Sequence, residues 1–210
     1  MNEFPADIFT EPTDVDPDTL HNLGPLRRMA GIWEGAKGID VNPGPDGTRR
    51  QAFIERIELQ PIDPQTNGPQ LFYGLHYVIR AVKPDQPETY HHQVGYWLWE
   101  PATRTVIQTL AIPRAQVAMA VGQASADATQ FALTATRGAP SYGICSTPFL
   151  EYGFRTESYR IVVTLNPDGT WSYEEDTVLI VRGRPEPFHH TDSNTLTRIA
   201  EATPNPLAPR

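Results

Sequence analysis

Proline is spread along almost the whole chain and limits the length of any regular element. The 210 residues include 21 Pro, from Pro5 to Pro209. Proline interrupts the interior of a helix and of a central strand. The gaps between the prolines are rich in Val, Ile, Thr, Tyr, Phe and Trp, which favour strands. This pattern predicts a chain of short strands and excludes a helical bundle or a coiled coil.

Ten segments have the composition of strands, and turn residues separate them. Leu71, Tyr73 and Tyr77 share one face of an alternating segment, as a strand requires. Asn166-Pro-Asp-Gly169 is a typical hairpin turn between two such segments. The expected strands are Gly31–Val41, Gln51–Gln60, Gln70–Val82, Tyr90–Glu100, Thr105–Ile112, Ala115–Ala124, Gln130–Thr136, Phe154–Leu165, Thr170–Arg182 and Phe188–Ile199.

The connections between these segments are short, so the strands are expected to pair in sequence as an antiparallel, up-and-down meander. Ten such strands would leave open edges unless the sheet closes on itself. We therefore expect an all-β fold, a ten-stranded antiparallel barrel that is wide enough to hold one small ligand. A sandwich of two sheets is the alternative that strand counting leaves open.

The whole chain is expected to consist of three parts. Residues 1–22 form an acidic, Pro-containing N-terminal arm, residues 23–200 the barrel, and residues 201–210 a C-terminal tail. Pro25 suits the first turn of a short helix just before the barrel. A long loop of small, uncharged residues is expected at Gly138–Leu150.

Charge and cysteine content narrow the possible partners. The chain has 17 Lys+Arg and 25 Asp+Glu, a formal charge of −8, which disfavours nucleic acid and anionic lipid. No apolar stretch approaches the roughly 18–20 residues that span a bilayer. The lone Cys145 excludes an internal disulfide. With no targeting segment in the sequence, these features predict a cytoplasmic protein with no nucleic-acid or membrane partner.

Several short motifs follow one another along the chain. They are Gly31-Ile-Trp33-Glu-Gly35 after Leu23 and Leu26, Phe53–Ile57, Val94-Gly-Tyr96, Thr109–Pro113, Ser158-Tyr-Arg160 and Asn194–Arg198. In this order they resemble the motifs of the nitrobindin-like, fatty-acid-binding-protein-like barrels (the THAP4-type haem-binding family). Lys37 stands where the last Gly of the family's opening motif belongs, and Gly38 follows. The resemblance covers residues 23–199 and implies a lipocalin-like (calycin) barrel in which Trp33 plugs one end.

The resemblance also implies haem held by one His of the last strand, with chemistry on nitric oxide and peroxynitrite. Aligning Asn194–Arg198 with the family's closing strand places Thr191 at the position of that His. Threonine cannot replace a neutral imidazole as an iron ligand. We therefore expect no cofactor, with haem b as the alternative.

Two neighbouring histidines could replace the missing ligand. Strand side chains alternate between two faces, so His189 has the same parity as Thr191 and is expected to point inward. His190 is then expected to point outward unless a bulge shifts the register. The opposing interpretation is that both are polar residues near a loop. A further metal set of three histidines, His76 with one His from each of the adjacent pairs His91-His92 and His189-His190, has no spacing that selects it.

Other side chains are candidates for the lining of a ligand cavity. Inward-pointing Arg80 and Arg160 would bind a carboxylate headgroup, whereas most strand arginines face water. Glu174-Glu-Asp176 is interpreted as a solvated strand edge. The remaining cavity candidates are Trp33, Tyr73, His76, Tyr77, Trp97, Trp99 and Thr191, of which the aromatic residues could equally be solid core.

Three functions remain open from the sequence. The leading hypothesis is a nitrobindin-like barrel that binds a small, largely apolar molecule in an internal cavity without normal haem ligation. The second is a haem protein with His189 or His190 as axial ligand, the one case that would make the chain an enzyme, resembling a peroxynitrite isomerase. The third is a packed barrel whose outer surface binds a protein. No catalytic motif is present, and a homodimer through an exposed barrel face is open in each case.

Overall fold

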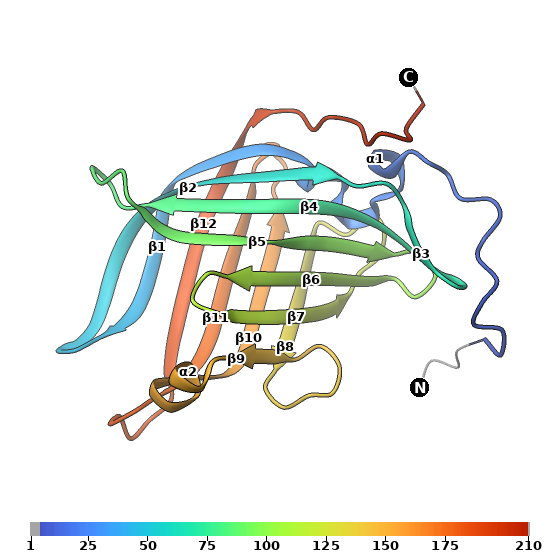
Figure 1. Cartoon of the computed structure of the whole chain (residues 1–210). Coiled ribbons are helices and arrows are strands. Elements are labelled where there is room, and N and C mark those ends of the chain that lie inside the picture. The colour runs from blue at the N-terminus through green and yellow to red at the C-terminus, as the bar shows by residue number, and fades with distance from the viewer. Residues whose placement is uncertain (1–4, 210) are drawn as a thin grey trace.

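The computed structural model describes residues 5–209, which form one closed sheet with few helical turns (Figure 1). Residues 1–4 of the expected N-terminal arm and Arg210 of the expected tail lie outside the described residues. In chain order, the elements are α1 (Thr19–Asn22), the 3-10 helix η1 (Gly24–Met29), β1 (Gly31–Gly44), β2 (Gly47–Pro61), β3 (Gln65–Asn67), β4 (Gln70–Val82), β5 (Thr89–Glu100), β6 (Thr105–Ile112), β7 (Gln116–Gln123), β8 (Gln130–Thr136), β9 (Ile144–Ser146), α2 (Pro148–Gly153), β10 (Phe154–Leu165), β11 (Trp171–Val181) and β12 (Phe188–Ala200).

Ten of these strands form the barrel. Around the ring the order is β1-β12-β11-β10-β8-β7-β6-β5-β4-β2, and β2 pairs again with β1, all antiparallel. Figure 1 shows β1 beside β12, so the first and last strands of the ring close it. This confirms the expected ten-stranded antiparallel barrel and excludes an open sandwich. Within residues 5–209, the short strands β3 and β9 pair with β4 and β7 outside the ring.

The segment Gly138–Leu150 is more ordered than the loop expected there. It contains β9 and the start of α2. At this point β7 and β8 share the single registered pair Val121–Thr134, and β9 pairs with β7 instead. The extra strand therefore supplies backbone partners where the two ring strands diverge.

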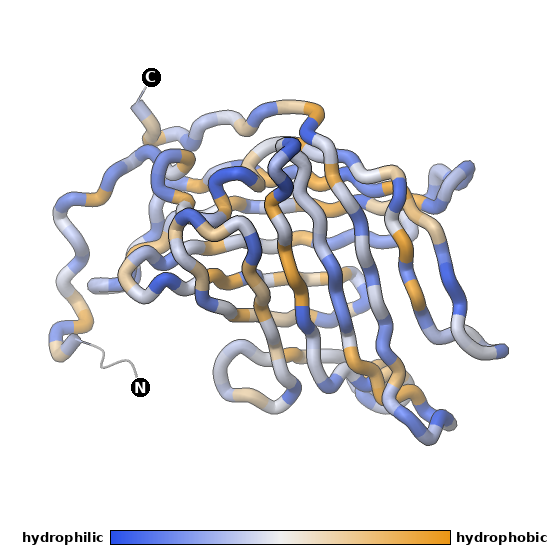
Figure 2. The backbone as a smooth tube through the Cα atoms, turned by 180° about the vertical axis from the view of Figure 1, so that it is seen from behind, coloured by the Kyte–Doolittle hydropathy of each residue, from blue (hydrophilic) through white to orange (hydrophobic). Residues whose placement is uncertain are grey.

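Alternation of side chains explains why the strands close around one core. Along β2, Phe53, Ile57 and Leu59 are buried, whereas Arg56 and Glu58 between them are exposed. Figure 2 shows the same mixture of apolar and polar residues along the strands. Burial of one apolar face per strand is the driving force for closing the sheet.

The closed end of the barrel is covered by η1 and filled with aromatic residues. Leu23, Leu26 and Met29 are wholly buried there, each burial contributing roughly 1.5–3 kcal/mol. The indole Nε1 of Trp33 donates a hydrogen bond to the carbonyl of Met29 (2.7 Å), and its ring meets Trp171 edge to face. These contacts tie the helical cap to the first strand of the barrel.

The opposite end contains the start of β12, the end of β1 and the start of β5, and α2 lies at its rim beside the start of β10 (Figure 1). Its inward side chains are polar and include the acids and histidines described below. Within residues 5–209, no helix is long and apolar enough to cross a membrane.

Candidate binding site at the open end of the barrel

The aromatic residues expected to line a cavity lie in the packed core. Trp33, Tyr73, Tyr77, Trp97 and Trp99 are all buried members of the main hydrophobic cluster. The Trp97 ring lies 6.3 Å from the ring of Tyr77 and 6.3 Å from that of Phe131, measured between centroids. These side chains therefore pack against one another at and near the closed end.

Four other candidates lie on the outer face, contrary to expectation. Arg80, Arg160 and His76 are exposed; the Arg80 guanidinium donates to the Thr89 hydroxyl (3.2 Å), and the His76 ring lies tilted against that of Tyr96 (centroids 5.5 Å apart). Thr191 pairs with Val41 on the face opposite to the inward Asp192. Their positions follow from alternation, because the side chains at the adjacent positions of each strand point inward. None of these four can contact a ligand inside the barrel.

The assignment of the two histidines of β12 is reversed. His189 is exposed and its Nδ1 lies 2.8 Å from Asp176 outside the barrel, whereas His190 points inward. Buried Asn194 and Leu196 place the even-numbered residues of β12 inside, and the pairing with β11 has no register shift. His189 was expected to point inward because it shares the parity of Thr191. Leu196, a large apolar residue at an even-numbered position, instead indicates that the even-numbered residues of β12 point inward.

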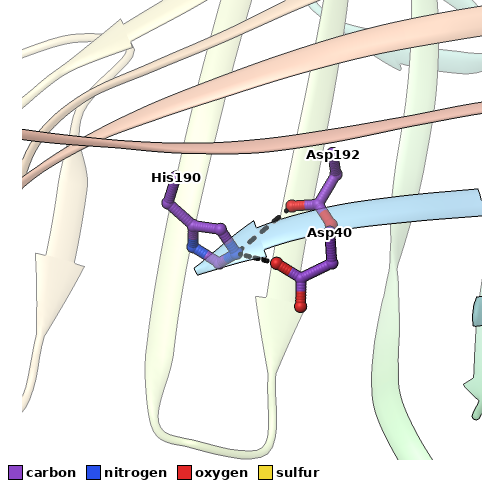
Figure 3. Close-up of side chains that lie close together, drawn as sticks. All are labelled: Asp40, His190 and Asp192. Atoms are coloured by element: carbon purple, nitrogen blue, oxygen red, sulfur yellow. Dashed lines mark hydrogen bonds and ion pairs between the residues drawn. The ribbon is translucent and has the colours of Figure 1, made fainter. Parts of the chain in front are cut away.

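His190 belongs to a cluster with two aspartates (Figure 3). Its Nε2 lies 3.0 Å from Oδ1 of Asp40 and 3.4 Å from Oδ2 of Asp192. Asp40 and Asp192 are direct cross-strand partners on β1 and β12. The Asp40 side chain is only 5% exposed, whereas those of His190 and Asp192 are 32% and 24% exposed. Asp40 is thus the buried member of the cluster, and solvent reaches the cluster at His190 and Asp192.

A β-bulge places Asp40 inside the barrel. In β1, Gly31, Trp33 and Gly35 are buried, but after the bulge the buried residues are Gly38 and Asp40. The register shifts between Gly35 and Gly38, so one extra residue reverses the parity. A strict alternation from Trp33 puts Asp40 outside, and this explains why the sequence analysis missed it.

Neighbouring side chains orient the Asp40 carboxylate. The side-chain amide of Asn42 donates to Oδ2 of Asp40 (2.7 Å), and the Tyr90 hydroxyl donates to the same oxygen. The other oxygen, Oδ1, faces His190. The Asp40 carboxylate is therefore held in one orientation, with Oδ1 directed toward His190.

A belt of buried polar side chains crosses the barrel below this cluster. Oε1 of Glu55 accepts from the Tyr173 hydroxyl and from the Asn194 amide, both at 2.8 Å. Oε1 of Glu175 accepts from the Tyr159 hydroxyl at 2.9 Å. The belt also includes Tyr77, Gln93 and Gln108, which are hydrogen-bonded to one another or to Tyr159.

Burial changes the proton affinity of these acids. Desolvation raises the pKa of Glu55 to about 7, against the hydrogen bonds from Tyr173 and Asn194, which lower it. Desolvation likewise raises the pKa of Glu175 to about 7. For Asp192, desolvation and then the Glu175 charge raise the pKa to about 7, although His190 opposes them. The inner face of the open half is thus proton-rich at neutral pH.

The pKa values of the two inward histidines, His190 and His91, are shifted in opposite directions by their surroundings. Burial alone lowers the pKa of His190, but its hydrogen bond to Asp40 and the charges of Asp192, Asp40 and Glu175 outweigh burial, and the pKa is raised. For His91, burial dominates and lowers the pKa. The surrounding carboxylates therefore favour the charged form of the His190 imidazole, whereas burial disfavours that of His91.

The inward positions of Glu55 and Glu175 can be recognised from the alternation of apolar residues in the sequence. Glu55 occupies an inward position between Phe53 and Ile57, where alternation demands an apolar residue. Glu175 follows Trp171 and Tyr173 at the same spacing, so the interpretation of Glu174-Glu-Asp176 as a solvated edge was wrong for its central residue. A charged residue on the apolar face of a strand marks a buried polar site.

A hollow of about 340 Å³ lies on the outer face of the barrel, bordered by exposed Lys37, Gln130 and Glu174 among others. Asp40, His190 and Asp192 do not border it. This hollow is therefore separate from the cluster of Asp40, His190 and Asp192 at the end of the barrel.

Comparison with known proteins agrees with this architecture. The crystal structure of Rv2717c from M. tuberculosis superimposes with a TM-score of 0.55 and 22% sequence identity, covering 88% of this chain and 99% of that chain, a likeness of fold. No curated protein matches the sequence. The family model described as "THAP4-like, heme-binding beta-barrel domain" matches residues 22–198, as the motif resemblance predicted. The chain therefore belongs to the THAP4-like, haem-binding β-barrel family.

Proposed function

We propose that this barrel binds one small, polar, positively charged ligand at its open end. The observation that carries the proposal is the set of four inward carboxyl groups in this half, those of Asp40, Asp192, Glu55 and Glu175. The charges that act on Asp192 come from Glu175, His190 and Asp40, so the carboxyl groups outnumber the one imidazole among them. A site with more carboxyl groups than cationic groups favours a positively charged ligand.

A largely apolar ligand, the leading hypothesis from the sequence, has less support. The aromatic residues that would line its cavity are packed in the core, and one of them, Tyr77, is a member of the polar belt. A fatty acid also lacks an anchor, because Arg80 and Arg160 both lie on the outer face. The geometry therefore favours a cationic over a carboxylate-bearing ligand.

Haem is the ligand that the family description names, and His190 is the inward histidine of the last strand. The residues around it do not fit a haem. The Nε2 of His190 faces the carboxylates of Asp40 and Asp192, so an iron on that nitrogen would displace both acids. A porphyrin also needs an apolar slot, and its propionates carry negative charge into an acidic opening.

Matched probes test the proposal. Isothermal titration calorimetry with hexylammonium and with hexanoate keeps the chain length constant and reverses the charge. We expect hexylammonium alone to bind, and we expect Asp192→Asn to weaken it about tenfold, since one charged hydrogen bond contributes roughly 1.5 kcal/mol. Asp176→Asn, on the outer face, is the control and should bind as the wild type does.

Two results would contradict the proposal. Stronger binding of hexanoate than of hexylammonium would mean that the inner carboxyls do not define the ligand. Addition of ferric haem that produced a Soret band lost in His190→Ala, but kept in His189→Ala, would return the function to haem binding.

A further inference from the structure

We propose that Asp40, His190 and Asp192 bind a divalent metal ion at the mouth of the barrel. The inference rests on the proposed function, because the ion is a small cation held at the same opening. One donor atom from each residue lies within 4.8 Å of the other two. An imidazole nitrogen with two carboxylate oxygens is a donor set that first-row divalent metals accept.

The spacing of the donor atoms already resembles that of a coordination shell. Ligand atoms held about 2.1 Å from one ion lie roughly 3.0 Å apart in octahedral geometry and roughly 3.4 Å apart in tetrahedral geometry. Nε2 of His190 lies 3.0 Å from Asp40 and 3.4 Å from Asp192. Small side-chain rotations would therefore place an ion between the three, as the convergence in Figure 3 illustrates.

The surroundings of Asp40 favour a ligand role. Tyr90 and Asn42 donate to Oδ2, which leaves Oδ1 for the ion. Hydrogen bonds of this kind fix the orientation of a coordinating carboxylate. Because Asp40 is almost fully buried on β1 and its partner lies on β12, the barrel itself holds the two carboxylates side by side.

The charge at the site matches that of a divalent ion. Two carboxylates and a neutral imidazole carry two negative charges, and Glu175 adds to the negative potential acting on Asp192 and His190. Coordination requires an Nε2 and carboxylate oxygens that carry no proton, and these are the atoms that face one another in the cluster.

Three protein ligands leave coordination positions free for water or a substrate. The exposed fractions of His190 and Asp192 show that solvent reaches this side of the cluster. Such an open set is typical of metal sites that take an exogenous ligand. Zn²⁺ and Mn²⁺ are the suitable probes, since imidazole suits the former and carboxylates the latter.

The experiment is calorimetric titration of the chelator-treated full chain with Zn²⁺ and with Mn²⁺. We expect one ion per chain, and a loss of affinity of more than about tenfold in His190→Ala and in Asp192→Asn. His189→Ala removes the exposed His–Asp pair beside the site and should bind as the wild type does. Tyr90→Phe leaves all three ligands and should weaken binding roughly tenfold to a hundredfold.

A spectroscopic measurement distinguishes a ligand role of His190 from a structural one. Mn²⁺ should broaden the imidazole NMR signals of His190 much more than those of His189. Circular dichroism of each variant establishes that it is folded.

The proposal is overturned if neither ion binds the wild type, or if His189→Ala abolishes binding while His190→Ala does not. Hexylammonium binding without metal binding would overturn this inference and leave the proposed function in place. The absence of both would overturn both.

Discussion

Replacing Glu55 with Gln should change the pH dependence of stability in a defined way. The Glu55 carboxyl is buried in the barrel, and its Oε1 accepts hydrogen bonds from Tyr173 and Asn194. Gln keeps an oxygen for both donors and has the shape of the protonated acid. Glu55→Gln therefore removes the ionisation and preserves the packing.

The magnitude follows from the pKa of Glu55, which burial raises from 4.5 to about 7. Because the folded state holds the proton more tightly than the unfolded state, this group's contribution is complete below pH 4.5 and is lost as the pH rises to about 7. At about 1.4 kcal/mol for each pH unit of separation, the loss is on the order of 3 kcal/mol. Glu175 and Asp192 act in the same direction.

The assay is urea unfolding of wild type and Glu55→Gln at several pH values from 4.5 to 8. We expect the two proteins to have similar free energies of unfolding at the acidic end, and the variant to be the more stable by on the order of 3 kcal/mol at pH 8. Glu58→Gln, an exposed position on the same strand, should follow the wild-type profile. A Glu55→Gln profile parallel to that of the wild type would refute the reasoning.

Three other substitutions test the fold. Gly38→Ala should lower the free energy of unfolding by about 1–3 kcal/mol in urea titrations, because its Cβ would lie 2.3 Å from the Phe53 ring beside the bulge; unchanged stability would mean that the ring moves freely. Leu196→Ala should cost roughly 2–5 kcal/mol by the same measurement, and exposed Ile199→Ala much less; equal costs would contradict the inward parity of β12. Gly169→Ala should cost about 1 kcal/mol in thermal unfolding, since φ there is +88°, and a gain in stability would contradict the assigned turn.

Most of the fold could be predicted from local patterns. The prolines and turn residues separate the strands, and alternation identifies the buried face of β2 and β4. The burial of Trp33 and Trp97 follows from the same patterns. These features are predictable because each depends on residues that are neighbours in the sequence.

The candidate site depends on features that are not local. Asp40 faces inward only because a bulge reverses the parity of β1, and His190 rather than His189 faces inward because the core residues of β12 have even numbers. Asp40 and His190 are 150 residues apart in the sequence. Composition and spacing thus determined by themselves that this chain forms a series of antiparallel strands, and the pairing of β1 with β12 and β2 decided that they close into a barrel rather than stack as a sandwich. Only the tertiary structure decided which acids and which imidazole meet inside it, because closing the ring brings the first and last strands together and a single extra residue selects the side chains that point inward.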